Sequence, residues 1–258
     1  MCDFASPEPS ALGQMAGQLV RPNAAPGAGA RRQLSAVEPQ DMRWLERLGA
    51  AARRHFGEVL EVRELPAGYP LLRAGQPPRE WVGVLRGFVP VTGGPASRHS
   101  TPEAIPEGAW FADNALIGGS LLDCDATTVM PTRVACVAAA DFRALLDAHC
   151  DFSDFILELQ AQRYAFLRQQ SAWPCEMSTD AKVACALASM FKPGVFFGGR
   201  HYLRSVQSVL GDFLSLSRQR TNAALRLLQG KGLVKVLYGG IEVLDPDSMI
   251  ESALNGRI

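Results

Sequence analysis

The spacing of apolar residues changes near residue 150, and this change is the strongest constraint on how the chain can fold. Over residues 59–137, short apolar runs alternate with turn residues such as Pro66-Ala67-Gly68. Many short strands at such intervals are typical of a small sandwich or barrel. From Asp151 the apolar residues recur at helical spacing until Pro174, which ends the helix because proline cannot donate a backbone hydrogen bond. We therefore expect a β-domain followed by one long helix.

Smaller patterns lie on either side of this boundary. Two apolar runs, 81–85 and 88–91, flank Arg86-Gly87, which is the spacing of a β-hairpin. Upstream, residues 39–56 place apolar side chains at helical spacing, which predicts a short helix. Residues 1–35 are rich in alanine, proline and glycine, and this composition buries too little apolar surface to offset the entropy of ordering. We expect a disordered tail there.

The helix expected over residues 151–173 carries a seam of the heptad type. Its members follow one another at alternating intervals of four and three residues. They are Phe155, Leu159, Gln162, Phe166, Gln169 and Trp173. Such a seam predicts pairing with a second helix. The alternative is an ordinary amphipathic helix that lies on its own domain, and the two glutamines keep this alternative open.

Residues 205–228 have the pattern of two helices joined by a tight turn at Ser215-Leu216-Ser217. One stripe runs along each helix: Val206, Val209, Leu210 and Phe213 in the first, and Thr221, Ala224, Leu225 and Leu228 in the second. Ser217 stands where an N-cap belongs. Beyond the second helix, residues 233–237 and 241–244 flank Tyr238-Gly239-Gly240, which predicts a hairpin or wing.

The second helix of this pair is polar and cationic on the side away from its stripe. From Arg200 to Lys235 the chain has seven basic residues and one acidic residue, although the whole chain balances 26 basic against 26 acidic side chains. Any attraction to nucleic acid therefore comes from local charge and not from a whole-protein field. Arginine can donate two hydrogen bonds to guanine, and glutamine or asparagine matches the edge of adenine. Such a helix suits a DNA major groove.

Three short motifs make the assignment more specific: GDFLSLSRQRTN at residues 211–222, Gly232-Leu233-Val234, and Tyr238-Gly239-Gly240-Ile241. Together they resemble the DNA-binding domain of the Crp/Fnr regulator family. The upstream half is similar to that family's cyclic-nucleotide-binding-like β-roll through four turns, Pro66-Ala67-Gly68, Arg73-Ala74-Gly75, Leu85-Arg86-Gly87 and Pro106-Glu107-Gly108. The resemblance covers about residues 55–250.

The resemblance implies an α+β fold in three parts. A double-stranded, jelly-roll-like β-roll would form an effector domain over residues 36–150. A long dimerisation helix would follow over residues 151–173, and a C-terminal winged helix-turn-helix would occupy residues 174–258.

The resemblance also implies a homodimer that reads an inverted repeat in double-stranded DNA and regulates transcription, contacting RNA polymerase if it is an activator. The implied base-reading positions are Arg218, Gln219, Asn222 and Ala223. The expected phosphate contacts are Ser217, Arg220, Arg226 and Lys231. Ala223 replaces an arginine that is common in the family, so we expect a different operator, and Ser215 replaces a usual turn glycine.

An effector pocket is implied in the β-roll. Aligning Gly108-Ala109-Trp110-Phe111 with the start of the family's nucleotide-binding cassette assigns this pocket to Trp110, Ala112, Asp113, Cys124, Asp125 and Thr127. Asp113 can still accept a hydrogen bond from a ribose hydroxyl. Cys124 replaces the arginine that pairs with the phosphate, and Asp125 adds a like charge beside it. A cyclic nucleotide is therefore not the expected effector.

The identity of the effector stays open. An iron-sulfur cluster needs about four thiolates, and only Cys2 lies in the N-terminal region where the family places them, so no cluster is expected. No two of the six cysteines have the spacing of a zinc motif, and no metal site is predicted. The candidate haem ligands are His55, His99 and His149, and the candidate oxidant-sensing thiols are Cys124, Cys136 and Cys150. Hydrogen-bonded histidines and buried, inert thiols are the alternatives.

Several function classes are not expected. The sequence has no glycine-rich phosphate loop, no Gly-x-Ser-x-Gly elbow and no His-Glu-x-x-His helix, so we do not expect an enzyme. It has neither a secretory signal nor an apolar run of the about eighteen residues that a membrane span needs, so we expect a cytoplasmic protein without a membrane partner. The alternative function is an effector-binding or scaffolding protein whose DNA-binding domain no longer reads a site, and the basic second helix argues against it.

Overall fold

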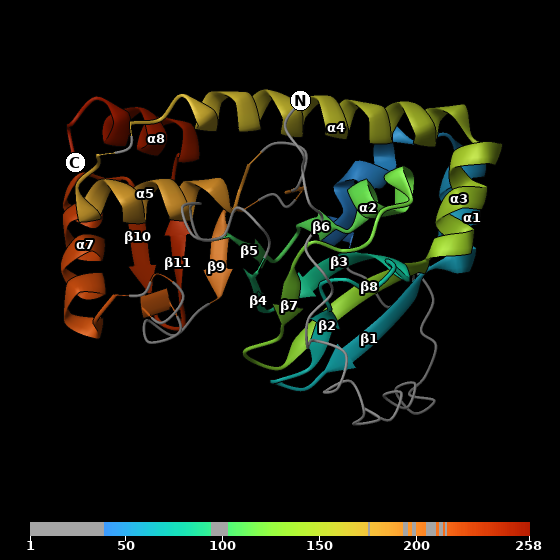
Figure 1. Ribbon diagram of the computed structural model, residues 1–258, viewed down its shortest axis with the longest axis horizontal. Coiled ribbons are helices and arrows are strands. Elements are labelled where there is room, and N and C mark those ends of the chain that lie inside the picture. The colour runs from blue at the N-terminus through green and yellow to red at the C-terminus, as the bar shows by residue number, and fades with distance from the viewer. Residues whose placement is uncertain are drawn as a thin grey trace, which may run out of the picture. The chain divides into compact units, whose positions relative to one another are not determined.

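The computed structural model describes residues 39–93, 103–174, 176–192, 196–197, 200–204, 210–211, 214 and 216–258 (Figure 1). The predicted tail, residues 1–35, lies outside them. The elements before residue 150 are the 3-10 helix η2 (Pro39–Arg47), α1 (Ala50–Val59), β1 (Glu61–Leu65), β2 (Pro70–Leu72), β3 (Glu80–Arg86), β4 (Phe88–Thr92), β5 (Glu103–Pro106), β6 (Trp110–Phe111), α2 (Asp113–Gly118), β7 (Asp125–Thr127), β8 (Thr132–Ala138) and α3 (Ala139–Ala148). The later elements are α4 (Cys150–Ser171), α5 (Thr179–Ser189), β9 (Tyr202–Arg204), α7 (Arg218–Gly230), β10 (Val234–Leu237), β11 (Gly240–Val243) and α8 (Pro246–Leu254).

In the described ranges before residue 150, eight strands form two four-stranded antiparallel sheets, with the orders β1-β8-β3-β6 and β2-β7-β4-β5. Apolar side chains from both sheets share one core: Val84 comes from the first sheet, and Val89 and Ala126 come from the second. All three are buried. The expected α+β fold with a β-roll is confirmed.

The hairpin predicted around Arg86-Gly87 is wrong. β3 and β4 follow each other directly, but they belong to different sheets, and β4 pairs instead with β5. At Gly87 the backbone has φ of 122°, and a Cβ there would lie 2.7 Å from the hydroxyl of Thr132. The Gly87 N–H donates to Glu107 Oε1 at 2.9 Å. Glycine at this position therefore lets the chain cross from one sheet to the other.

The single helix predicted over residues 39–56 is divided in the structure. The 3-10 helix η2 contains a kink at Met42, where φ is −139° and ψ is 44°, and α1 begins only after Gly49. The Gly49 N–H donates to Asp151 Oδ2, at the start of α4. The apolar spacing arises because each piece buries one side, with Leu45 buried in η2 and Phe56 buried in α1.

An aromatic core joins η2, α1, the β-roll and α4. Trp44 lies parallel to Phe155 with 4.8 Å between ring centroids, and its edge meets Phe56 and Trp81 at 5.1 and 5.5 Å. Trp81 packs on Trp110 at 4.2 Å. Offset and edge-to-face pairs of this kind are favourable beyond the area that they bury. This core holds α4 on the β-roll.

The dimer seam predicted on α4 is wrong, because its apolar members pack against their own chain. Phe155 and Leu159 belong to the aromatic core, and Phe166 packs with side chains of α5. Of the other members, Gln162 is half-buried and donates to Glu158, Gln169 is exposed, and Trp173 meets the edge of Phe166 at 6.2 Å. The alternative of an amphipathic helix lying on its own domain is therefore correct for this face.

Large apolar side chains are exposed elsewhere on α4. Leu157, Tyr164 and Leu167 are 66%, 65% and 53% exposed. Because each residue advances about 100° around a helix, Leu157 and Tyr164 lie on the side opposite the buried seam, and Leu167 lies beside them. We call these three residues the outer face of α4. None of the described helices combines the length and apolarity needed to cross a membrane.

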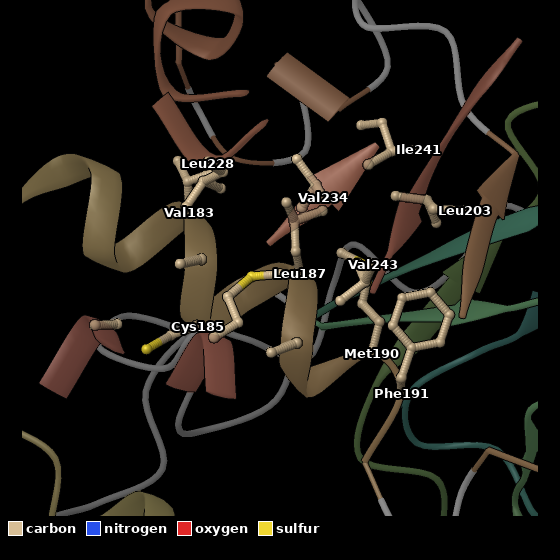
Figure 2. Close-up of a cluster of buried hydrophobic side chains, with 14 of the residues drawn as sticks. Val183, Cys185, Leu187, Met190, Phe191, Leu203, Leu228, Val234, Ile241 and Val243 are labelled. Carbon is tan, nitrogen blue, oxygen red and sulfur yellow. The ribbon is translucent and has the colours of Figure 1, made fainter. Parts of the chain in front are cut away.

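The C-terminal part combines helices with a three-stranded antiparallel sheet in the order β10-β11-β9. Figure 2 shows its core, in which Val183 and Leu187 of α5 gather with Leu228 of α7 and with Val234 and Val243 of the hairpin. Ser178 caps the start of α5, because its side-chain oxygen accepts from the Ala181 N–H. The first helix of the predicted pair, residues 205–213, lies mostly outside the described residues.

Candidate nucleic-acid interface and effector site

The helix α7 begins where the sequence predicts. Ser217 Oγ accepts from the Arg220 N–H at 3.2 Å, and Thr221 Oγ1 donates to the Ser217 carbonyl at 3.1 Å. This N-cap satisfies one of the amide groups that a helix start leaves without a partner. The predicted stripe of Thr221, Ala224, Leu225 and Leu228 is buried, which confirms the burial side of the helix.

The opposite side of α7 is polar and accessible. Arg218, Gln219, Ala223 and Arg226 are exposed. Asn222 is half-buried, and its Oδ1 is buried with no hydrogen-bond partner in the described part of the chain. The four predicted base-reading residues therefore lie in the first two turns of one helix, three of them exposed.

The hairpin packs beside α7 and leaves a hollow between them. This hollow is lined by Asn222, Leu225, Arg226, Gln229 and Val236. Gln229 Oε1 accepts from the Val236 N–H at 2.9 Å, which ties β10 to the last turn of α7. Tyr238 stands fully exposed between the two strands, before Gly239 with φ of 84°. The hairpin predicted at this place is confirmed.

The predicted phosphate contacts differ in their surroundings. Ser217, Arg226 and Lys231 are exposed. Arg220 is instead paired with Asp180 of α5, with 3.0 Å between Nη2 and Oδ2. Its side chain is still 43% exposed. A phosphate that approached Arg220 would therefore find its guanidinium already paired with the Asp180 carboxylate.

Asp113 lies at the centre of the predicted effector site, and its side chain is completely buried. Its Oδ2 accepts from Arg163 Nη1 and from Gln160 Nε2, each at 2.5 Å. Arg163 also donates to the carbonyl of Trp110 at 3.2 Å. Asp113 Oδ1 has no partner among the described residues. The carboxylate is thus neutralised by a cation from α4.

Asp125 provides a second carboxylate among the predicted pocket residues. Asp125 Oδ1 accepts from the Ala74 N–H at 3.1 Å. Cys124 is half-buried and Thr127 is exposed. Ala112 has a φ of 75°, a left-handed conformation that costs a residue with a Cβ about 1–2 kcal/mol. An anionic ligand would therefore meet a side-chain carboxylate, Asp113 or Asp125, at each of the two positions where the resemblance places contacts to a nucleotide.

Comparison with known proteins identifies a domain family and similar folds. Residues 62–149 match the family model of the cyclic nucleotide-binding domain. No curated protein sequence matches the chain. A putative cyclic nucleotide binding protein from Ruegeria pomeroyi is 14% identical, with a TM-score of 0.53 over 85% of this chain and 97% of that one. FixK2 from Bradyrhizobium japonicum is 13% identical, with a TM-score of 0.50 over 75% of this chain and 96% of that one. A putative Crp/Fnr-family transcriptional regulator from Eubacterium rectale is 18% identical, with a TM-score of 0.44 over 83% of this chain and 100% of that one.

The chain has a Crp/Fnr-like fold. The pocket assigned by resemblance therefore lies within the region that matches the cyclic nucleotide-binding domain. Sequence reasoning missed Arg163 and Gln160, the two α4 residues that complete the Asp113 cluster in this Crp/Fnr-like chain. No local pattern could have found them, because Arg163 lies 50 positions from Asp113 in the sequence.

The histidines and thiols of the Crp/Fnr-like chain have identifiable surroundings. His55 Nδ1 and His149 Nε2 lie 3.0 Å apart, so these two candidate haem ligands share a hydrogen bond. Burial raises the pKa of Cys136 far above its usual range, which keeps it a thiol and agrees with the inert alternative. Cys124 is half-buried and Cys150 is exposed. His99 and Cys2 lie outside the described residues.

Proposed function

We propose that this protein is a transcription regulator that binds DNA as a homodimer. One observation carries the proposal: α7 buries one side in its own domain and leaves Arg218, Gln219 and Arg226 exposed on the rest of its surface. A helix that is anchored on one side and offers two-donor and amide side chains on the other suits the major groove. An enzyme would need a constellation of catalytic groups, and the sequence motifs for one are lacking.

We divide the chain into three functional parts, with boundaries at residues 150 and 174, as the resemblance implies. The β-roll is the effector domain, α4 is the dimerisation helix, and the region from residue 174 holds a winged helix-turn-helix. In this arrangement α7 is the recognition helix, and β10 and β11 form the wing. Arg218, Gln219, Asn222 and Ala223 read bases, and Ser217, Arg226 and Lys231 contact phosphates.

The dimer interface that we propose is the outer face of α4. Leu157, Tyr164 and Leu167 expose more than half of their surface, which is costly for large apolar side chains in water. The same face of a second copy would cover them, and two α7 helices would then address two half-sites of an inverted repeat.

In the β-roll, Cys124 stands where the resemblance places the arginine that pairs with the phosphate, and Asp125 adds a like charge beside it. For the effector class we therefore propose a ligand other than a cyclic nucleotide.

The function can be tested with the full-length protein and a pool of random duplexes. Repeated selection should enrich an inverted repeat whose half-sites are about one helical turn apart, at 10–10.5 base pairs or a multiple of it. Fluorescence anisotropy on the selected duplex should give an affinity that falls steeply with salt, since each phosphate contact releases counterions. A pool without enrichment, or binding that does not respond to salt, would contradict the proposal.

A further inference from the structure

Asp180 and Arg220 form an ion pair at the edge of the proposed recognition surface. Asp180 lies in the first turn of α5, Arg220 lies in the first turn of α7, and Nη2 is 3.0 Å from Oδ2. The Asp180 side chain is 19% exposed, whereas that of Arg220 is 43% exposed. The other carboxylate oxygen, Oδ1, is buried with no partner in the described ranges. The Asp180 carboxylate is therefore largely buried while the Arg220 guanidinium stays more accessible.

Arg220 lies between two sides of α7. At about 100° per residue, it follows Gln219 on the polar side and precedes Thr221 in the buried stripe. A cation at the edge of a recognition helix, within its first turn, is well placed for a backbone phosphate and not for a base. Arg220 therefore has the position of a phosphate contact but already has an anionic partner.

We propose that Asp180 lowers the affinity of α7 for the DNA backbone, because its carboxylate competes with phosphate for Arg220. The inference rests on the proposed DNA-binding function and adds a residue that tunes affinity. A phosphate close to Arg220 would also lie close to the Asp180 carboxylate, which repels it as a like charge. A phosphate contact at Arg220 therefore releases fewer counterions than a contact at an arginine without an acidic partner. Backbone contacts bind all sequences alike, whereas base contacts do not. Weakening one backbone contact therefore raises the fraction of the binding free energy that depends on sequence.

The variant Asp180→Asn tests this inference, because it keeps the shape of the side chain and removes its charge. At about 0.1 M salt, affinity should rise about threefold to tenfold, and the slope of log K against log salt should steepen by up to about 0.9, the contribution of one phosphate. The fold-change should be the same on a scrambled duplex as on the selected one, because a backbone contact binds all sequences alike. Glu58→Gln, an exposed carboxylate of α1, changes the net charge equally and should leave both values unchanged.

A second arm does not depend on the folding of the Asp180 variant. Arg220→Gln should cost the otherwise unchanged protein less than about twofold in affinity, since its charge is already neutralised. In the double variant, Asp180→Asn should bring no gain. Circular dichroism and thermal melting should show that each variant is folded.

The outcomes separate the two hypotheses. If Asp180→Asn binds no more tightly than the unchanged protein, or if Arg220→Gln alone costs tenfold, the competition model is wrong, while the selected duplex still binds. If neither the unchanged protein nor any variant binds a selected duplex, the proposed DNA-binding function itself fails.

Discussion

Arg163 of α4 reaches the completely buried carboxylate of Asp113 at the start of α2, with 2.5 Å between Nη1 and Oδ2. The Arg163 side chain is only 11% exposed. A pair this far from water is stable only when both partners are present, because either one alone would leave a buried charge without compensation. The contact therefore fixes α4 on the β-roll without any ligand.

Replacing Arg163 by methionine should lower the free energy of unfolding by about 3–5 kcal/mol, because Asp113 then stays buried without its cation. Urea denaturation measured by circular dichroism gives this value. The control Arg54→Met removes an exposed arginine of α1 and should change stability by less than about 0.5 kcal/mol. Adding Asp113→Asn to Arg163→Met should recover part of the loss, and strict additivity of the two changes would contradict a direct pair.

Cyclic AMP should not stabilise the protein. A ligand that binds only the folded state at 100 times its dissociation constant adds about 2.7 kcal/mol to stability and raises the melting temperature accordingly. We expect no shift with millimolar cyclic AMP, because Cys124 offers no positive charge to its phosphate and Asp125 opposes it. A melting temperature that rises with nucleotide concentration and then saturates would overturn this expectation.

The sequence was most informative where structure is local. The start of α7 could be predicted because Ser217 caps a helix whose stripe, from Thr221 to Leu228, repeats at helical spacing. The start of α8 carried an equally local signal, since Asp245 caps it and Pro246 takes its first turn. β9 carries no such signal, because its three residues are too few to show a period.

Pairing between distant segments could not be predicted in the same way. The runs around Gly87 have hairpin spacing, but only the complete β-roll decides that they belong to two sheets. The period of α4 correctly identified Phe155, Leu159 and Phe166 as one face, yet it does not tell whether a second copy or the same chain covers that face. The Asp113–Arg163 pair depends on side chains from two elements and has no signal in either.

Charge on the outer face of α4 should separate the proposed dimer. The double variant Leu157→Glu/Tyr164→Glu places two carboxylates where the partner's apolar side chains would lie, and sedimentation should detect monomers that keep the melting temperature of the β-roll. The matched change Leu121→Glu, at a residue 60% exposed near α2, should leave the dimer intact. A double variant that sediments as a dimer would move the interface away from α4.

His201 should make the C-terminal part less stable in mild acid. Burial lowers the pKa of His201 below its usual 6.5, and Asp245 and Asp247 only partly offset this effect. As the pH falls through about 6.5, the unfolded chain takes up this proton before the folded chain does, so stability is lost on acidification and is unaffected well above that pH. Between about pH 8 and pH 5.5, the melting temperature of His201→Gln should therefore fall less than that of the unchanged protein. If both melting temperatures fell equally, His201 would not be the group responsible for the loss of stability.

Two single substitutions should distinguish base reading from phosphate contact on the selected duplex. Arg218→Ala should cost about 1–3 kcal/mol of binding free energy and relax the preference at one base pair, because it removes a pair of donors from a base edge. Lys231→Ala should weaken binding to every sequence alike and reduce the salt slope by about one, because an ammonium at the end of α7 meets only backbone charge. Anisotropy against a set of single-base operator variants measures both effects. Arg54→Ala, which removes an equal charge from α1, should bind as the unchanged protein does. If Arg218→Ala lowered affinity equally for all operator variants, the arginine would contact phosphate, and base reading would have to come from Gln219 and Asn222.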